Sequence, residues 1–265
     1  MGVDLQARDP RKKASAMKRA TTISFVVPAY NEEASLARSL EAIAAEVNRS
    51  GCDAEIIVVN NASTDGTRQV AECFSQAIVV DEPVKSLVRA RAAGYQVATG
   101  ELIANIDADT ILPPEWLNKV LSAFAADPQL VAISGPYIYY DVPKHISLLV
   151  RAFYRAGYVA YLLNRYVLRA GSMLQGGNFV VRRSAIARIG GFNTDFAFYG
   201  EDTDLARRLS KVGRVTFTFA LPALSSGRRL LSEGVVRMGI RYAMNFFWAT
   251  FLKRPFTRTW VDVRK

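Results

Sequence analysis

The 265-residue sequence has few cysteines and histidines. It contains two cysteines, Cys52 and Cys73, and a single histidine, His145. The cysteines fall in a predicted loop and a predicted helix, which indicates reduced thiols rather than a disulfide scaffold. Zinc-finger spacing and a basic-zipper pattern are also absent, so we expect no nucleic-acid partner.

Long apolar runs are missing as well. No stretch reaches 18 consecutive apolar residues, the length at which a membrane-spanning helix is expected. The nearest candidate, 242–252, has 11 residues and contains Asn245. No apolar run precedes Ile23, so the basic first segment does not have the pattern of a secretory signal. We therefore expect a cytoplasmic protein without a membrane span.

The charge of the chain is large and unevenly distributed. Half of the residues are apolar and 22% are charged, a globular balance that excludes disordered, collagen-like and coiled-coil chains. The formal net charge of +10 indicates an anionic partner. Residues 20–141 carry seven Lys and Arg against sixteen Asp and Glu, a net charge of −9, whereas 142–227 carry twelve against four, +8. The first half of the chain is therefore acidic and the second half is basic.

Apolar, β-branched runs alternate with helical patterns along the first half. We predict strands at 23–27, 56–59, 78–80 and 102–106, and helices at 33–49, 66–75 and 113–126. A further helix follows the strand at 78–80 and ends at about 98. This rhythm is typical of an α/β protein with a doubly wound, mostly parallel central sheet flanked by helices. Ligands of such sheets bind beyond the carboxyl ends of the strands.

The residues just past these strand ends are polar and largely acidic. They are 28–32, 60–65, 81–82 and 107–109. Divalent cations such as Mg²⁺ and Mn²⁺ prefer oxygen ligands, and a bound cation would neutralise a diphosphate. The pattern predicts a metal and diphosphate site at this edge of the sheet.

The second half has a different pattern. We predict strands at 179–181 and 215–219, helices at 183–189 and 202–212, and one amphipathic C-terminal helix at 231–252. Residues 147–169 and 242–252 are apolar and aromatic, with arginines interspersed in the first of these segments. Core packing, a dimer interface and contact with a membrane surface all remain open for the two segments.

Several short motifs occur in a fixed order along the chain. They are Val-Val-Pro-Ala-Tyr-Asn-Glu-Glu at 26–33, Asn-Asn-Ala-Ser-Thr-Asp-Gly-Thr at 60–67, Ala-Arg-Ala-Ala-Gly at 90–94, Asp-Ala-Asp at 107–109, Gly-Asn at 177–178, Gly-Gly-Phe at 190–192 and Gly-Glu-Asp-Thr-Asp-Leu at 200–205. This order resembles the family 2 glycosyltransferases, which have the GT-A nucleotide-sugar-binding fold. The resemblance covers about residues 22–230.

The resemblance implies a division of the chain. A basic tail, 1–21, precedes a GT-A domain at 22–230, and an amphipathic helix with a basic tail follows at 231–265. Within the domain, 22–140 would bind the nucleotide and 141–230 the acceptor, with a helical insert at 147–169.

The resemblance also implies nucleotide-binding residues. Pro28, Tyr30 and Glu32 match the nucleoside-binding segment, Asp107 the ribose-side acid and Asp109 the metal-binding acid. Arg91 matches a basic residue that reaches the nucleotide, and Lys85 is a weaker candidate for that role. Asn61 stands where the family usually has an Asp that binds the base, so the identity of the base stays open.

Further residues match the catalytic and acceptor side of the family. Gly177, Asn178 and Glu201 match the side of the donor sugar and acceptor, and Arg228 lies in a segment that resembles one closing over the diphosphate. Asp202 matches the catalytic base. An inverting transfer needs one carboxylate to take the acceptor proton, and we expect an acid at a helix start to be ionised and exposed. The second acid of this motif, Asp204, is interpreted as a first-turn acid favoured by the helix dipole.

The resemblance implies an inverting, metal-dependent glycosyltransferase. It would move a sugar from a nucleotide-diphosphate donor of UDP, GDP or dTDP type to a hydroxyl on a glycan or a lipid-linked glycoconjugate. We interpret His145 as structural, which leaves Asp109, diphosphate oxygens and water to hold Mn²⁺ or Mg²⁺.

Three alternatives remain open. The first is a polyprenyl-phosphate glycosyltransferase. The second is a nucleotidyltransferase, although 28–32 lacks the glycine-rich loop of that class. The third is a non-catalytic, membrane-associated nucleotide-binding module. Peripheral contact with an anionic inner membrane face is compatible with the basic second half and tails.

Overall fold

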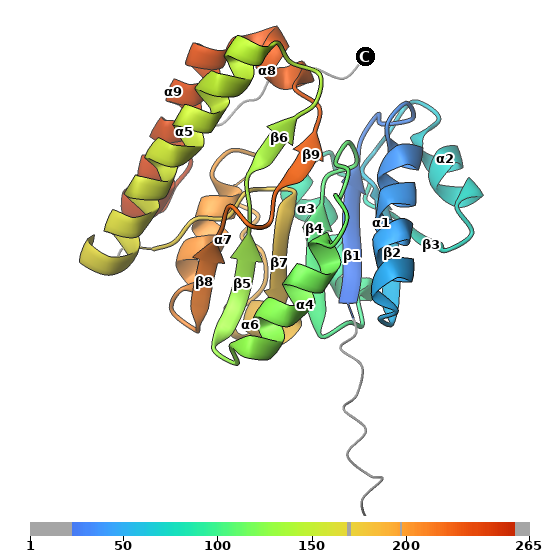
Figure 1. Ribbon diagram of the computed structural model, residues 1–265. Helices are drawn as coiled ribbons and strands as arrows, with labels where there is room; N and C mark the ends of the chain where they lie inside the picture. Colours follow the sequence, from blue (N-terminus) through green and yellow to red (C-terminus); the bar gives the residue numbers. More distant parts are fainter. Residues whose placement is uncertain (1–22, 169–170, 197, 258–265) are drawn as a thin grey trace, which may run out of the picture.

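A computed structural model describes residues 23–168, 171–196 and 198–257. Its centre is a seven-stranded sheet in the order β3-β2-β1-β4-β7-β5-β8 (Figure 1). Only β7 runs antiparallel to its neighbours, so the sheet is mostly parallel, as predicted. The strands are β1 (Ile23–Ala29), β2 (Ala54–Asn60), β3 (Ala77–Asp81), β4 (Leu102–Ile106), β5 (Leu130–Ser134), β7 (Asn178–Arg182) and β8 (Arg214–Phe217).

Helices cover both faces of this sheet. One face packs against α1 (Leu36–Ser50), α2 (Thr67–Cys73) and α4 (Trp116–Ala126). The other packs against α3 (Leu87–Val97), α6 (Arg183–Arg188) and α7 (Glu201–Leu209). Every residue of β1 and β4 is buried, because a strand between two helical layers needs apolar side chains on both sides.

The predicted strands and helices of the first half are confirmed, with shifts at their ends. β1 continues through Pro28, which pairs with Val59, and ends at Ala29. The first helix begins at Leu36 rather than at 33, after a turn. The prediction missed β5, a five-residue apolar run that is buried along its whole length.

The C-terminal segment differs from the prediction of one helix over 231–252, which is wrong. The chain forms α8 (Arg228–Glu233), α9 (Val235–Phe247) and the π-helix η3 (Trp248–Leu252). Gly234 separates the first two with φ 84°, a conformation that favours glycine. A two-stranded parallel ribbon of β6 (Tyr137–Tyr139) and β9 (Ala223–Ser225) was also not predicted. The domain boundary predicted at 230 falls inside α8, and the domain division itself stays a prediction.

The insert predicted at 147–169 forms α5 (Lys144–Leu162), which continues into the π-helix η2 (Leu163–Leu168). Its buried residues are Tyr161 and Asn164, so core packing accounts for little of its apolar surface. Among the described residues, 144–168 is the one helix long and apolar enough to cross a membrane, with mean hydropathy 1.2. The absence of a membrane span stays a prediction, because the length and hydropathy of a helix do not by themselves show that it crosses a membrane.

Two further predictions concern the cysteines and the tails. Cys52 and Cys73 are both free, as predicted. The basic segment 1–21 and residues 258–265 lie outside the described residues.

Candidate active site

A pocket of about 140 Å³ lies past the carboxyl ends of β1 and β4. It brings together loops that are far apart in the sequence, as the mostly parallel sheet predicts. The predicted site residues that line it are Pro28, Glu32, Arg91, Asp107, Asp109, Glu201, Asp202 and Arg228.

The carboxylates of Glu32 and Asp109 share one guanidinium. Arg228, the first residue of α8, is ion-paired with Glu32, and its Nη2 lies 3.0 Å from Oδ2 of Asp109. A positive charge therefore already sits between two largely buried acids, and carboxylate oxygens are the donors that Mg²⁺ and Mn²⁺ prefer. The residues present fit a divalent cation on chemical grounds.

The protein supplies only part of a metal shell. The described residues contain no group of three or more His, Cys, Asp or Glu placed to hold an ion. His145 is exposed on the first turn of α5 and does not line the pocket. A cation at Asp109 would therefore need oxygens from its ligand or from water.

Arg91 lies beneath the pocket rather than in open solvent. Its side chain is 1% exposed, is ion-paired with Glu201, and lies 3.4 Å from Oδ1 of Asp107. Burial raises the pKa of Glu201 to about 7, an effect that Arg91 opposes and the charge of Asp202 adds to. Arg91 thus joins the acidic loop after β4 to the start of α7.

Asp202 is held by backbone amides. Its Oδ2 accepts a hydrogen bond from Gly176 N at 3.0 Å, and its Oδ1 accepts one from Thr203 N at 2.8 Å. The carboxylate is half-buried, so the prediction of an exposed acid is wrong, because the loop containing Gly176 lies against it. Burial raises the pKa of Asp202 above its ordinary value. The nearby Asp204 is ion-paired with Arg207 and Arg208 of the same helix, which supports a structural role.

The loop before β7 connects Asp202 of α7 with Asp107 of the acidic loop after β4. Gly177 accepts a hydrogen bond from Asp107 N at 3.2 Å and has φ 77°. A Cβ at this position would lie 2.1 Å from the carboxylate of Asp107, so glycine is required.

Two predicted residues of this loop do not line the pocket. Asn178 is fully buried, donates to the carbonyls of Gly135 and Leu221, and accepts from Trp116 Nε1. It and Gly177 are absent from the pocket lining, and Gln175 and Gly176 line the pocket in their place. The motif predicted that Asn178 lies on the side of the donor sugar and acceptor. In the structure its amide forms hydrogen bonds with three other segments of the chain.

A small adjoining pocket contains the predicted nucleoside residues Tyr30 and Asn61, together with Lys85. The Lys85 ammonium lies 3.8 Å from the centre of the Tyr30 ring. Asn61 Nδ2 donates to the carbonyls of Glu82 at 3.1 Å and Val84 at 2.7 Å. An aspartate cannot donate these bonds, which accounts for asparagine here. The contact with the base stays a prediction.

Sequence reasoning missed the aromatic wall of the pocket. Tyr137, Tyr139, Tyr199 and Tyr242 line it from β6, the loop before α7, and α9. The hydroxyl of Tyr137 lies 3.0 Å from Oδ2 of Asp107. The spacing of Tyr137 and Tyr139 is typical of one face of a strand, but β6 becomes evident only through its pairing with the distant β9.

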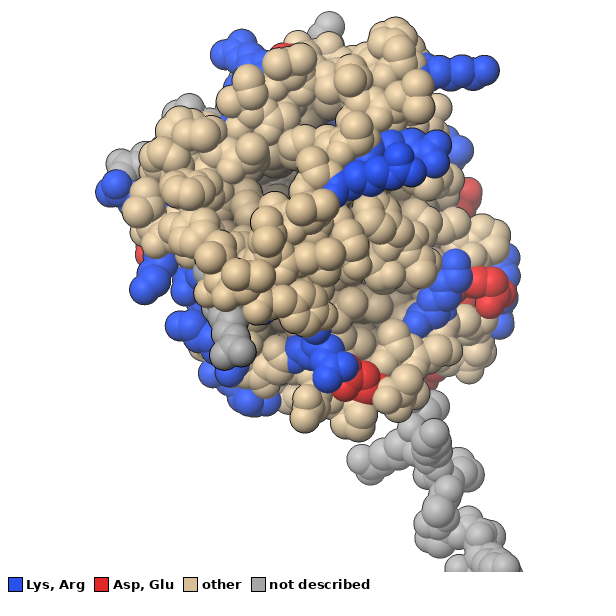
Figure 2. Space-filling model, turned by 60° about the vertical axis from the view of Figure 1, so that its left-hand side comes forward, with Lys and Arg blue, Asp and Glu red and all other residues tan. Residues whose placement is uncertain are grey.

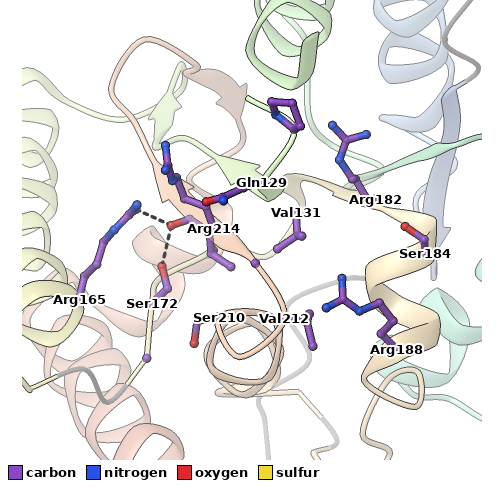
Figure 3. Close-up of a pocket in the computed structure, with 14 residues that line it drawn as sticks. Gln129, Val131, Arg165, Ser172, Arg182, Ser184, Arg188, Ser210, Val212 and Arg214 are labelled. Carbon is purple, nitrogen blue, oxygen red and sulfur yellow. Dashed lines mark hydrogen bonds between the residues drawn. The ribbon is translucent and has the colours of Figure 1, made fainter. Parts of the chain in front are cut away.

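A larger cavity, about 730 Å³, lies elsewhere, at the amino ends of β5 and β8 (Figure 3). Its lining includes four arginines: Arg165, Arg182, Arg188 and Arg214. Arg165 and Ser172 donate to the carbonyl of Val215, so part of this set supports the backbone of β8. None of the predicted site residues lines this cavity.

Comparison with known families agrees with this arrangement. The model of "Glycosyl transferase family 2" matches residues 24–190, and that of "N-terminal domain of galactosyltransferase" matches 164–224. The probable glycosyltransferase YdaM of Bacillus subtilis is 26% identical over 212 residues, which are 74% of this chain and 48% of YdaM. An undecaprenyl-phosphate 4-deoxy-4-formamido-L-arabinose transferase of Pseudomonas fluorescens is 32% identical over 108 residues, 38% of this chain and 31% of the relative. The chain thus spans less than half the length of both relatives.

Solved structures agree with the fold. The mannosyltransferase PcManGT from Pyrobaculum calidifontis, solved with GDP-Man and Mn²⁺, superimposes with TM-score 0.60 at 24% identity, covering 86% of this chain and 65% of that one. Residues 1–349 of TarS from S. aureus superimpose with TM-score 0.59 at 15% identity, covering 88% and 73%. The central sheet, its flanking helices and these matches show the GT-A fold, and the chain belongs to glycosyl transferase family 2.

Proposed function

We propose that this protein transfers a sugar from a nucleotide-diphosphate sugar to a hydroxyl group on a glycan or a lipid-linked glycoconjugate. The observation that carries the proposal is the meeting of Asp107 and Asp109 with Asp202 in one pocket. One acidic loop would face the donor diphosphate, and the opposite carboxylate would face the acceptor. Both are needed for glycosyl transfer with inversion.

The donor would lie along the carboxyl edge of β1, β2 and β4. Tyr30, Asn61 and Lys85 line the small pocket proposed for the nucleoside. The complex of the mannosyltransferase with GDP-Man supports a nucleotide-sugar donor, and UDP, GDP and dTDP types all remain candidates.

Asp109 would hold Mn²⁺ or Mg²⁺, with Asp107 and Glu32 beside it. When bound, the cation would neutralise charge on the leaving diphosphate. Arg228 contacts two of these acids, so we propose that its guanidinium moves to the diphosphate when the donor binds. The Mn²⁺ in the mannosyltransferase structure supports the choice of metal.

Asp202 would act as the general base. It would take the proton of the acceptor hydroxyl, whose oxygen bonds to the anomeric carbon while the bond from that carbon to the diphosphate breaks. The electron pair of the broken bond leaves with the nucleoside diphosphate. A raised pKa strengthens the carboxylate as a base.

Replacing Asp202 tests this role. We expect Asp202→Asn to lower the rate of transfer by about 10²–10⁴-fold, because the amide cannot accept the proton. Binding of UDP, GDP or dTDP, measured as a thermal shift with and without Mn²⁺, should be unchanged. Asp195→Asn, at an exposed acid in the preceding loop, is the matched control and should keep full activity. Failure of all three nucleotides to shift the melting temperature of the wild type would contradict the donor proposal.

A second candidate is transfer to a polyprenyl phosphate. The similarity to the undecaprenyl-phosphate 4-deoxy-4-formamido-L-arabinose transferase of Pseudomonas fluorescens supports it. A phosphate oxygen is already ionised and has no proton to lose, so transfer by this route would survive in Asp202→Asn. The same variant therefore separates the two candidates.

We also propose that the protein contacts an anionic membrane through α5–η2 and α9–η3, which we call the docking face. Figure 2 shows this side as largely uncharged, with one group of Lys and Arg that reaches toward its middle and others near its edges. Exposed apolar residues on it include Leu148, Val167, Val236 and Ile240, each more than half exposed. Segments 144–168 and 235–252 contain no acidic residue. These features are typical of a helix pair lying in a membrane interface. We propose that this interface is on the cytoplasmic side of the membrane.

The contacts of α5 favour lying on the membrane over crossing it. Tyr161 is buried against the domain, and Tyr154 donates a hydrogen bond to the side chain of Gln175 at 2.8 Å. Arg165, at the far end, donates to the carbonyl of Val215. A helix crossing the membrane would lose these three attachments.

A further inference from the structure

An apolar groove of about 620 Å³ runs beneath α5. One wall is a single face of the helix, formed by Ser147, Val150, Arg151, Tyr154 and Arg155. The opposite wall is formed by 136–139 of β6 and its approach, together with Phe219 and Pro222. The volume lies in the range of small-molecule sites, and most of the lining is apolar.

This groove shares a wall with the active-site pocket. Tyr137 and Tyr139 line both cavities. Tyr154, from the helix side, accepts a hydrogen bond from Tyr137 N at 3.1 Å. It also bonds to Gln175, the neighbour of the Gly176 that holds Asp202. Only the side chains of this shared wall would therefore separate a molecule in the groove from the pocket that contains Asp202, the proposed base.

The groove also adjoins the docking face. Leu148, Leu149 and Phe153, on the same turns of α5, are 64%, 52% and 42% exposed. An apolar chain could pass from a bilayer into the groove without crossing a polar surface.

Two arginines give the groove its charge. Arg151 and Arg155 lie one turn apart, and no described carboxylate lies within ion-pair distance of either. No acidic residue lines the groove, so two guanidinium groups are available to an anion. Guanidinium groups bind phosphate through paired N–H donors.

We infer that this groove binds the apolar chain of a phosphate-bearing amphiphile, with Arg151 and Arg155 contacting the phosphate. The inference rests on the proposed function, since it identifies how a lipid-linked acceptor reaches Asp202. The acceptor hydroxyl would then lie beyond Tyr137 and Tyr139, in the active-site pocket.

Filling the groove tests the inference. We expect decyl phosphate to bind the wild type, and to bind Val150→Trp at least tenfold more weakly, because the indole occupies the groove. Val159→Trp, at a position 57% exposed on the same helix, is the matched control and should bind as the wild type does. The double variant Arg151→Gln, Arg155→Gln keeps the groove open and should also weaken binding tenfold. Titration calorimetry below the micelle concentration measures each affinity.

Comparison ligands separate the possible sources of binding. Inorganic phosphate and decyl maltoside should each bind far more weakly than decyl phosphate, because each has only one of the two features. Equal binding of decyl phosphate to the wild type and Val150→Trp would overturn the inference, as would equal binding of inorganic phosphate. Nucleotide thermal shifts in the same variants report on the donor pocket, so loss of the donor proposal is seen separately from loss of the groove.

Discussion

The proposed nucleotide-binding half of the molecule, residues 22–140, and the proposed docking face use polar and apolar side chains in opposite ways. Around the nucleotide site, polar groups are buried and bonded to one another, as in the contacts of Arg91 with Glu201 and Asp107. On α5 and α9, apolar groups are exposed, and segments 144–168 and 235–252 contain no acidic residue, although Arg241 is ion-paired with Glu233 of α8. The buried polar groups are largely paired within the chain, although Arg91 Nε and Glu201 Oε2 have no hydrogen-bond partner among the described residues. The exposed apolar groups form the surface that we propose contacts a membrane.

The charge follows the same division. Residues 20–141 carry −9, where a cation and a diphosphate are proposed to bind, and 142–227 carry +8. The net +10 of the whole chain therefore describes neither region. The local charges support the two different partners proposed above, a metal-bound donor on one side and an anionic lipid on the other.

The largest expected effect is a pH dependence of stability that arises at the junction between the nucleotide loops and α7. Burial raises the pKa of Glu201 to about 7 from 4.5. Between these values the folded protein binds more protons than the unfolded chain, so stability falls as pH rises through the window and then levels off. The full shift corresponds to about 3 kcal/mol.

Urea unfolding at pH 5 and pH 8 measures this difference. Glu201→Gln has no proton to lose, so its stability should change much less between the two pH values, whatever its absolute value. Equal pH dependence in the wild type and the variant would show that Glu201 does not titrate in this range.

A smaller effect is expected for Asn61→Asp in the nucleotide-binding half. The carboxylate would face the carbonyls of Glu82 and Val84, to which the amide now donates. We expect a loss of about 1–3 kcal/mol in the free energy of unfolding, because two buried acceptors lose their donor. Asn48→Asp, at an exposed position of α1, is the control and should keep wild-type stability. Wild-type stability in Asn61→Asp would mean that the amide bonds to the 82–86 loop are not required.

The smallest effect on folding is expected on the docking face. Val236, on α9, is 72% exposed, so Val236→Asp should change the free energy of unfolding by less than about 0.5 kcal/mol. The same variant should reduce flotation with phosphatidylglycerol vesicles, because a charge enters the apolar surface. Val97→Asp, on the nucleotide-binding half, is the exposed control and should float as the wild type does.

Salt and lipid composition sharpen this last comparison. Binding to phosphatidylglycerol vesicles should weaken at high salt, since each basic residue near an anionic surface contributes about 1 kcal/mol. Equal flotation with phosphatidylcholine would contradict an anionic partner, and no flotation at low salt would contradict the docking face itself.

Much of the nucleotide-binding half could be predicted from sequence. The strand at 102–106 has the predicted bounds, and Asp107 and Asp109 follow it into the pocket. This succeeded because a strand between two helical layers must be continuously apolar, and its polar successors must lie at the ligand edge. The role of Asn178 on the donor-sugar and acceptor side stays a prediction, and the sequence did not predict that its amide is bonded to Gly135, Leu221 and Trp116.

By itself, the sequence determined the α/β class, the acidic edge of the sheet and the resemblance to the family 2 glycosyltransferases. These depend on local periodicity and on residues close in the chain, which a single sequence contains. Only the tertiary structure decided that Arg228 lies between Glu32 and Asp109, that Tyr137 and Tyr139 separate two cavities, and that α5 is largely exposed. Each of these depends on segments distant in sequence, and an apolar helix has the same pattern whether it packs in a core or against a membrane.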